Sequence, residues 1–289
     1  MLNLLVVETV VKAALAEDLG NGDLTSNVLF TPSDEGHGEI IAMDEGIVAG
    51  LPVAALAFKC VFPGCNFTPL VSEGTKVTRG LVVAAVKGPL LAILGAERVA
   101  LNFLQRMSGI ATYTASYVDR IRGYKARICD TRKTAPGLRL IDKYAVRVGG
   151  GINHRFSLGD AVLLKDNHLK AAGGILPAVK KLRQSIPLTA KIEVEVENLD
   201  QVEEALAADV DIIMLDNMKP QAMYQAVQRI AGRALVEASG GITLDQVEEV
   251  AATGVDFISV GALTHSAPTL NFSLELANNP AGGKITDPF

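Results

Sequence analysis

The chain lacks tryptophan entirely, and aromatic residues make up only 5% of its 289 residues. Few aromatics disfavour a β-sandwich built on large aromatic anchors, and the abundant alanine, valine and glycine suit closely packed α/β layers. Cysteine is also scarce, with only Cys60, Cys65 and Cys129 present. Three thiols form no even disulfide framework and offer too few ligands for zinc, so we expect reduced cysteines in a cytoplasmic protein.

Positive charge is in deficit, with 27 Lys and Arg against 32 Asp and Glu and a pI of about 5.5. Proteins that bind nucleic acids usually carry a basic domain, so no nucleic-acid partner is expected. The apolar N-terminal segment, residues 1–20, is interrupted by Glu8, Lys12 and Glu17. We expect an amphipathic helix ending near Gly20, rather than a signal peptide or a membrane span.

Against this acidic background, residues 129–168 form a basic segment with seven Lys or Arg residues and two of the four histidines. Glycines and other small residues separate the cations, which is typical of a pocket rather than a polycationic tail. Guanidinium groups bind carboxylates and phosphates well, so the pattern predicts a site for a small, multiply charged anion. The alternative is a salt-bridged surface, because acids in the same segment can pair with the cations: Asp130, Asp142, Asp160 and Asp166.

The second half of the chain alternates between strand-like and helical runs. Predicted strands end near Asp130, Lys165, Val196, Leu215, Ala238 and Val260, and predicted helices span 176–185, 199–208, 219–231 and 243–253. An internal repeat matches 199–216 to 244–261, with ten of 18 positions identical. Such β-α units imply parallel strands with right-handed crossovers. Repetition and polar strand ends favour a barrel over an open sheet, and six or seven visible strands indicate an incomplete one.

The first half reads differently, since residues 39–94 show short strand-like runs punctuated by glycine and proline. Residues 71–88 resemble the hairpin of lipoyl and biotinyl carrier domains, without the motif that surrounds their modified lysine. A helical pattern follows from Ala96 to Arg122, with an expected break at Gly109. We therefore predict an α/β sandwich domain at 1–108 and a catalytic barrel domain at 109–269, with 270–289 packing on the first.

Polar residues at the predicted strand ends are the candidates for chemistry. KIEVEVEN (191–198) alternates strictly, so in a barrel its glutamates face the interior and need cations or Mg²⁺ as partners. An edge strand with a solvated face is the alternative. Asp216 ends another strand, as a site residue or only a helix cap. Glycine-rich turns at 238–243 and 260–265 follow the last two strands and predict a phosphate site.

Lys165, at the end of the AVLLK run, suits either a Schiff-base lysine or an ion pair with Asp166. His154 lies next to Arg155, whose charge is expected to depress the pKa of the imidazole, so we predict a hydrogen-bond donor. His168, His265 and His37 are weaker candidates.

Several motifs together resemble the quinolinate phosphoribosyltransferase family. They are TRKTAPGLR, KYAV, GGGINHR, LGD, KDNH, EVEVE, MLDN, EASGGIT and SVGALTHSAP, with ERVALNFLQRMSGIAT at 97–112. The resemblance implies an N-terminal open α/β sandwich joined to an incomplete seven-stranded α/β barrel, in homodimers or hexamers. It also implies a Mg²⁺-dependent reaction of pyridine nucleotide (NAD) biosynthesis, in which quinolinate and phosphoribosyl pyrophosphate give nicotinate mononucleotide, pyrophosphate and CO₂.

The resemblance also implies a role for each matching residue. Arg132, Lys133, His154 and Arg155 would hold the quinolinate carboxylates, completed by Lys165 and by Arg98 from the neighbouring subunit. Glu195 and Asp216 would bind the ribose hydroxyls and Mg²⁺ and, with Lys165, act in catalysis. Ser239, Gly240, Gly241 and Gly261 would take the 5′-phosphate.

Three rival hypotheses stay open at this point. A paralogous phosphoribosyltransferase with another acceptor would share the same motifs. A Schiff-base barrel lyase would use Lys165, although it would not need the surrounding cations and two phosphate turns. A non-enzymatic carrier would depend on the segment at 71–88.

Overall fold

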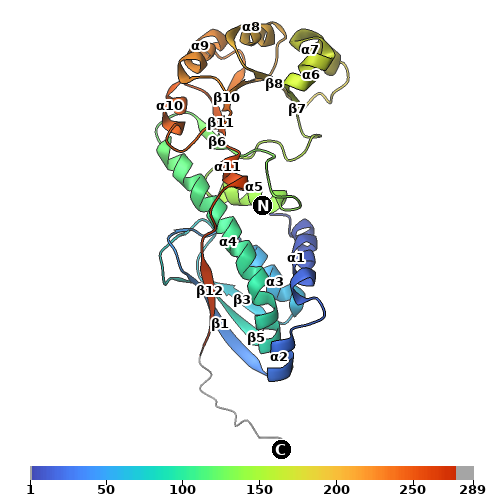
Figure 1. The fold of residues 1–289 in the computed structure, drawn as a ribbon, viewed down its shortest axis with the longest axis vertical. Helices are drawn as coiled ribbons and strands as arrows, with labels where there is room; N and C mark the ends of the chain where they lie inside the picture. The colour runs from blue at the N-terminus through green and yellow to red at the C-terminus, as the bar shows by residue number, and fades with distance from the viewer. Residues whose placement is uncertain (1, 278–289) are drawn as a thin grey trace, which may run out of the picture. The chain divides into compact units, whose positions relative to one another are not determined.

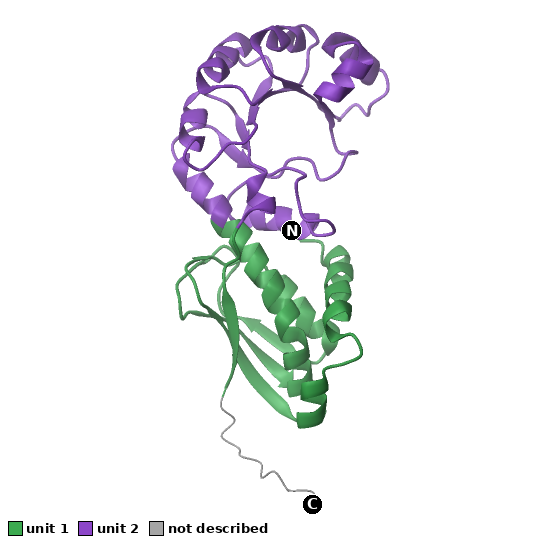
Figure 2. Cartoon of the chain, in the orientation of Figure 1, with its two compact units in different colours: residues 1–112, 268–289 green, residues 113–267 purple. Residues whose placement is uncertain are grey.

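The computed structural model describes residues 2–277, which divide into two compact units (Figure 2). Unit 1 comprises residues 1–112 and 268–289, and unit 2 comprises residues 113–267. The part of the predicted 270–289 tail that lies beyond residue 277 is outside the described residues. No helix within residues 2–277 combines the length and the apolar composition that a membrane span requires.

Unit 1 packs helices against a four-stranded antiparallel sheet in the order β12-β1-β5-β3 (Figure 1). Its helices are α1 (Leu4–Leu19), α2 (Leu24–Leu29), α3 (Leu51–Val61) and the start of α4 (Leu90–Arg120). Its strands are β1 (Glu35–Ala42), β2 (Gly46–Ile47), β3 (Asn66–Pro69), β4 (Lys76–Val77), β5 (Val82–Pro89) and β12 (Phe272–Leu276). The C-terminal strand β12 pairs with β1, which completes the sheet with residues that follow unit 2 in the chain.

Three expectations for this region were wrong. Residues 51–61 form helix α3, because proline at its start and a run of small apolar residues suit a helix that is buried on several sides. Residues 71–88 form no hairpin, because β4 pairs with β2 in a separate two-stranded sheet while β5 joins the main sheet. Helix α4 is unbroken at Gly109, where a Cβ atom would lie 2.0 Å from the carbonyl oxygen of Pro268. This glycine serves close packing instead of a break.

Unit 2 is a parallel barrel with helices on its outside (Figure 1). Its strands are β6 (Arg127–Cys129), β7 (Val162–Leu164), β8 (Ile192–Val196), β9 (Ile212–Asp216), β10 (Leu235–Ser239) and β11 (Phe257–Ser259). Its helices after α4 are α5 (Arg139–Val148), α6 (Asp166–Ala172), α7 (Ile175–Arg183), α8 (Leu199–Ala207), α9 (Pro220–Ile230), α10 (Val247–Ala252) and α11 (Ala262–His265). The strand order β6-β11-β10-β9-β8-β7 joins the first strand to the last, which confirms the α/β barrel.

The barrel is incomplete at one seam. A seventh strand position is reduced to the single parallel bridge between Cys129 and Ile152. Residues 153–161 connect this position to β7 without a helix. A crossover between neighbouring parallel strands takes a dozen or more residues, so this segment is too short to bring the two strands into register. The seam therefore leaves a loop where the other connections place helices, and this loop carries His154 and Arg155.

Candidate active site

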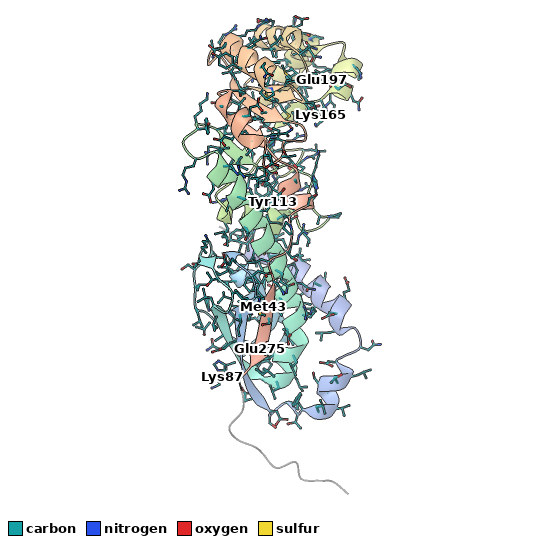
Figure 3. All side chains as sticks on the ribbon, turned by 60° about the vertical axis from the view of Figure 1, so that its left-hand side comes forward. Met43, Lys87, Tyr113, Lys165, Glu197 and Glu275 are labelled. Carbon is teal, nitrogen blue, oxygen red and sulfur yellow. The ribbon has the colours of Figure 1, made fainter. Side chains whose placement is uncertain are left out.

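The carboxyl ends of β7 to β10 bring four predicted site residues to one end of the barrel. Lys165 follows β7, Glu195 lies in β8, and Asp216 and Ser239 end β9 and β10 as direct register partners. The Nζ atom of Lys165 lies 2.5 Å from Oε2 of Glu195 (Lys165 is labelled in Figure 3). An ammonium group held by a carboxylate is not the neutral amine that a Schiff base requires, so this contact counts against the lyase hypothesis.

The alternation predicted for β8 is confirmed. Its valines and isoleucine are fully buried beneath the outer helices, whereas Glu193 and Glu195 meet His154 and Lys165 respectively. The interpretation of Asp216 as a helix cap is wrong, because α9 begins at Pro220 and its N-cap is Lys219. The Oδ2 atom of Asp216 instead accepts a hydrogen bond from the side chain of Asn217 at 2.6 Å.

The two glycine-rich turns lie against other candidate residues. Gly240 and Gly241 have φ angles of +100° and +61°, which favour glycine. A Cβ atom on Gly240 would also lie 2.6 Å from the backbone nitrogen of Asn217, so the turn after β10 packs directly on the residue after Asp216. At the turn after β11, a Cβ atom on Gly261 would lie 3.0 Å from Cδ of Lys133.

The cationic side of the site is formed by Arg132 and Lys133 after β6 and by Arg155 in the seam loop. Within residues 2–277 the side chains of Arg132 and Lys133 have no hydrogen bond or ion pair, and the side chain of Arg155 donates only to the carbonyl oxygen of Ala161 at 2.8 Å. Burial, followed by the charge of Arg132, lowers the pKa of Arg155, although a guanidinium of this kind stays charged. Uncompensated neighbouring cations favour an anion as ligand.

Three of the four acids of the basic segment are engaged elsewhere, which argues against the salt-bridged surface. Asp130 pairs with Lys143, Asp166 pairs with Lys170, and Asp160 accepts hydrogen bonds from Ser157. The cations proposed as ligands are therefore not the ones that these acids bind.

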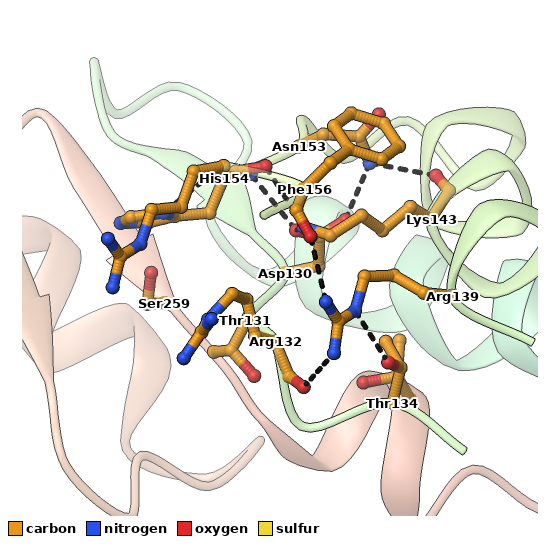
Figure 4. Close-up of polar contacts among 12 residues, drawn as sticks. Asp130, Thr131, Arg132, Thr134, Arg139, Lys143, Asn153, His154, Phe156 and Ser259 are labelled. Atoms are coloured by element: carbon orange, nitrogen blue, oxygen red, sulfur yellow. Dashed lines mark hydrogen bonds and ion pairs between the residues drawn. The ribbon is translucent and has the colours of Figure 1, made fainter. Parts of the chain in front are cut away.

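A buried network positions the seam loop (Figure 4). Asp130 and Lys143 are fully buried and form an ion pair, and Asn153 donates to Asp130 Oδ2 at 2.5 Å. Asp130 also accepts the backbone N–H of His154 at 2.9 Å, while Lys143 donates to the carbonyl oxygen of the same residue at 2.9 Å. Arg139 adds a bond from Nη1 to the carbonyl oxygen of Phe156 at 2.9 Å. These contacts hold His154 and Arg155 where a crossover helix is missing.

The surroundings of His154 differ from the expectation of a depressed pKa. Burial lowers the pKa of His154, but the hydrogen bond with Glu193 and the charges of Glu237 and Glu193 raise it overall. Nε2 lies 3.1 Å from Glu193 Oε2 and 3.6 Å from Glu237 Oε2. The expected effect of the adjacent Arg155 was wrong, because the carboxylates near Nε2 outweigh both burial and the charge of Lys143.

Glu237 was missed as a site residue, as were Asp130, Lys143 and Asn153. Glu237 is only 3% exposed, and burial followed by the charge of Glu193 raises its pKa to about 8. The only signal in the sequence was a single carboxylate within the otherwise apolar or small LVEAS strand.

The remaining predicted residues make no contact with these site residues that bears on catalysis within the described part of the unit that holds each of them. Arg98 is exposed on α4 in unit 1. His168 accepts from the backbone N–H of Lys165 through Nδ1 at 3.1 Å, and His265 contacts Ser266. Both contacts are local, so neither histidine gains a catalytic partner among the described residues.

Two family models cover this chain. The model for the N-terminal domain of quinolinate phosphoribosyl transferase matches residues 23–108, and the model for its C-terminal domain matches residues 110–275. The chain belongs to the quinolinate phosphoribosyltransferase family. The family predicted from the motifs is thereby confirmed.

Individual relatives match over nearly their whole length. A probable carboxylating nicotinate-nucleotide pyrophosphorylase from Synechocystis is 45% identical over 278 residues, covering 95% of this chain and 94% of that protein. Its counterpart from Bacillus subtilis is 44% identical and covers 90% of each chain. The solved structure of NadC from Streptococcus pyogenes superposes with a TM-score of 0.92 at 42% identity, covering 96% of this chain and 98% of that one. The predicted activity, that of a carboxylating nicotinate-nucleotide pyrophosphorylase in NAD biosynthesis, is confirmed.

Proposed function

We propose that the unit 2 site transfers the phosphoribosyl group of phosphoribosyl pyrophosphate to quinolinate and then releases the carboxylate next to the ring nitrogen as CO₂. The observation that carries this proposal is the division of one barrel end between unpaired cations and carboxylates. Arg132, Lys133 and Arg155 suit an acceptor with two carboxylates, while Glu195 and Asp216 suit ribose hydroxyls.

The residue roles follow the chemistry of each ligand. His154 joins the three cations around the acceptor. Lys165 exchanges its partner Glu195 for the departing pyrophosphate. The 5′-phosphate takes the backbone N–H groups of the two glycine turns, because such turns bind phosphate without any charged side chain. The residues of this subsite are Ser239, Gly240, Gly241 and Gly261.

The reaction then balances without a lysine imine. The pyridine nitrogen forms a bond to the anomeric carbon of the ribose as the bond to pyrophosphate breaks, through an oxocarbenium-like state that interior carboxylates stabilise. The alkylated nitrogen is cationic and accepts the electron pair left when CO₂ departs, and a proton replaces the lost carboxylate to give nicotinate mononucleotide.

Mg²⁺ is the proposed metal, and the residues present fit it. Glu195 and Asp216 offer carboxylate oxygens on neighbouring strands β8 and β9, and Mg²⁺ prefers such hard ligands together with substrate phosphates. When bound, the ion supplies charge neutralisation for the leaving pyrophosphate. Lys165 adds a positive charge beside Glu195.

We propose a homodimer in which Arg98 of one subunit completes the acceptor site of the other. Unit 1 exposes apolar side chains on α1 and α2, where Leu5, Leu24 and Val28 are 82%, 86% and 83% exposed. Large apolar side chains left exposed on successive helices are typical of a surface that another chain covers. A hexamer built from such dimers and a cytoplasmic location both stay predictions.

One assay separates the hypotheses. Purified protein with quinolinate, phosphoribosyl pyrophosphate and Mg²⁺ is expected to release CO₂ and nicotinate mononucleotide in equal amounts. Turnover with another pyridine or aromatic acid in place of quinolinate would favour the paralogue. Borohydride trapping of a substrate on Lys165 would favour the lyase, and a mass increase on a lysine within residues 71–88 would favour the carrier.

The acceptor site is tested by Arg132→Ala. We expect quinolinate affinity to fall on the order of a hundredfold while phosphoribosyl pyrophosphate binding survives, because a desolvated Arg–carboxylate contact contributes a few kcal/mol. Calorimetric titration of each substrate measures this, and Arg122→Ala, at an exposed arginine paired with Asp119, is the control. Unchanged quinolinate affinity would contradict the assignment.

The metal site is tested by Asp216→Ala. We expect the Mg²⁺ dependence and turnover to suffer by at least about a hundredfold. The free energy of unfolding should change by less than about 1 kcal/mol, because Asp216 caps no helix. Asp200→Ala, at the exposed start of α8, is the matched control. A melted protein with normal residual turnover would make Asp216 a structural residue.

A further inference from the structure

The barrel interior contains an acid pair, Glu193 from β8 and Glu237 from β10. Both are nearly fully buried, at 2% and 3% exposure. Within residues 2–277 no lysine or arginine forms an ion pair with either, and the group that lies close to both carboxylates is the ring of His154. Two buried carboxylates at close range cannot both stay ionised without compensation, so the pair requires a metal ion or a proton.

The hydrogen bonds of His154 decide between these two. Nδ1 of the ring accepts the backbone N–H of Arg155 at 2.8 Å, which places the ring proton on Nε2. Nε2–H then points at the acid pair, 3.1 Å from Glu193 Oε2. The three groups have ligand atoms within 4.8 Å of one another, as a metal site would. A metal would need the lone pair of Nε2, so the ring proton would have to move to Nδ1. There it would face the backbone N–H of Arg155, and two donors would meet without an acceptor.

The proton belongs to Glu237. Ser259 donates to Oε1 of Glu237 at 2.6 Å, which leaves Oε2 of the same carboxyl to carry a proton. Glu193 accepts from His154 through Oε2, while its buried Oε1 has no hydrogen-bond partner within residues 2–277. A proton on Oε2 of Glu237 would therefore face an acceptor that has no other partner among the described residues, Oε1 of Glu193.

The other groups that face Glu237 do not supply a compensating charge. Cys129 on β6 is a buried thiol whose pKa is raised by burial and then by the charge of Glu237, so it stays neutral. On β9 the register partner is Met214, which does not titrate. Two cations act on this cluster from a distance: Lys143 on α5 acts on His154 but is committed to Asp130, and Arg155 in the seam loop acts on Glu193 without forming an ion pair with it.

We propose that Glu237 is a positioning residue of the acceptor site: as a neutral acid it fixes, together with Glu193, the Nε2–H face of His154, and its ionisation weakens binding of the dicarboxylate substrate. The ligand in this inference is the quinolinate proposed above, so the inference rests on that assignment. An ionised Glu237 places a second negative charge behind His154, where the low dielectric of the interior screens it poorly.

The pH dependence follows with a definite sign. Below pH 8 Glu237 holds its proton, the acid pair carries one negative charge, and the acceptor site is at full strength. Above pH 8 the proton is lost, and the extra negative charge repels an incoming dianion. The same charge raises the pKa of His154. Affinity for quinolinate should therefore fall as the pH rises through about 8. Affinity for phosphoribosyl pyrophosphate, which Glu195, Asp216 and the glycine turns would bind, should change far less.

The test compares the full-length wild type with Glu237→Gln, which keeps the shape and the hydrogen bonds of the neutral acid. Quinolinate dissociation constants are measured by calorimetry between pH 6.5 and pH 9.5. We expect about a tenfold loss of affinity in the wild type across this range, and a profile flat to within about twofold in Glu237→Gln, since the added charge is absent. Glu249→Gln, at an exposed position on α10, should follow the wild type.

The outcomes separate cleanly. A wild-type pH profile in Glu237→Gln would overturn the inference, and so would a 1:1 Zn²⁺ site in the wild type that this variant loses. If the variant fails to fold, difference infrared spectroscopy of the wild type replaces it: a protonated carboxylic acid band that persists at pH 7 and vanishes by pH 9.5 supports the inference, and its absence at pH 7 overturns it. Wild-type protein that binds no quinolinate at pH 7 would instead refute the proposed function.

Discussion

At the scale of single residues, the site depends on side chains whose partners come from distant parts of the chain. The strand patterns made Glu195 and Asp216 candidates and the family resemblance assigned their roles, because each lies at or near the end of a strand that can be located from its own sequence. Glu237 and Lys143 escaped prediction, because their roles arise only when β8, β10, α5 and the seam loop meet. Local patterns indicate where a side chain points, and they carry no information about what it meets.

Glu237 also has a measurable effect on stability. Its pKa is about 8 in the folded state, against 4.5 for an ordinary glutamic acid, so the folded chain binds the extra proton between these values. The free energy of unfolding therefore falls as the pH rises from about 4.5 to 8, by about 1.4 kcal/mol for each pKa unit at most. Glu237→Gln should remove this cost.

We accordingly expect Glu237→Gln to be more stable than the wild type at pH 8, by a margin that shrinks toward pH 5. Denaturant unfolding at the two pH values measures this margin, with Glu249→Gln as the control at an exposed site. A margin of the same size at both pH values would mean that the glutamine acts through packing, not through the proton.

At the scale of elements, the sequence predicted the barrel better than unit 1. Strand ends and helix ranges in unit 2 lie within a few residues of their predicted positions, because each β-α unit repeats the same pattern of apolar and polar residues. In unit 1 the pairing of β4 with β2, and the helix α3, depend on contacts outside each segment. The expected helix break at Gly109 was the clearest error. Glycine is needed at this position because the backbone of Pro268 leaves no room for a side chain, and the helix continues through it.

Gly109→Ala tests that explanation. Helix propensity alone favours alanine by about 1 kcal/mol at an interior helical position. The added methyl group would overlap the backbone of Pro268 at 2.0 Å and approach Thr269 at 2.9 Å, and backbone cannot give way cheaply. We expect the clash to win and the free energy of unfolding to fall by about 2 kcal/mol or more. A stabilised variant in chemical denaturation would mean that the β12 connection is free to shift.

Gly95→Ala provides the comparison within the same helix. At this position the nearest atom to an added Cβ is a side-chain carbon of Leu19 at 3.4 Å, which is ordinary contact. The substitution should be neutral or stabilising, because only helix propensity changes.

At the scale of the whole molecule, the proposed sharing of sites between subunits makes a prediction by counting. Arg98→Ala and Lys165→Ala dimers should each be nearly inactive. If Arg98 acts across the interface, unfolding and reassembling an equal mixture yields heterodimers with one intact and one doubly damaged site. Random assembly of closed two-fold dimers then restores about a quarter of all sites.

Turnover before and after remixing measures the restored fraction, and mass spectrometry of intact dimers shows that exchange has occurred. Mixtures of either variant with itself provide the baseline. A remixed sample that exchanges subunits yet stays as inactive as its parents would place Arg98 in its own subunit's site, or in no site.

The pairing of β12 with β1 has a consequence for how the chain is made. Residues 38 and 276 face each other in that sheet, so unit 1 acquires its edge strand only after the whole barrel has been synthesised. Translation proceeds from the N-terminus, and domains generally fold as units while it does so. Until β12 is synthesised, one edge of β1 in unit 1 stays unpaired. Unit 2, by contrast, has all its strands in one continuous stretch of the chain. The nascent chain is thus open to strand-to-strand association with a neighbouring copy until β12 emerges.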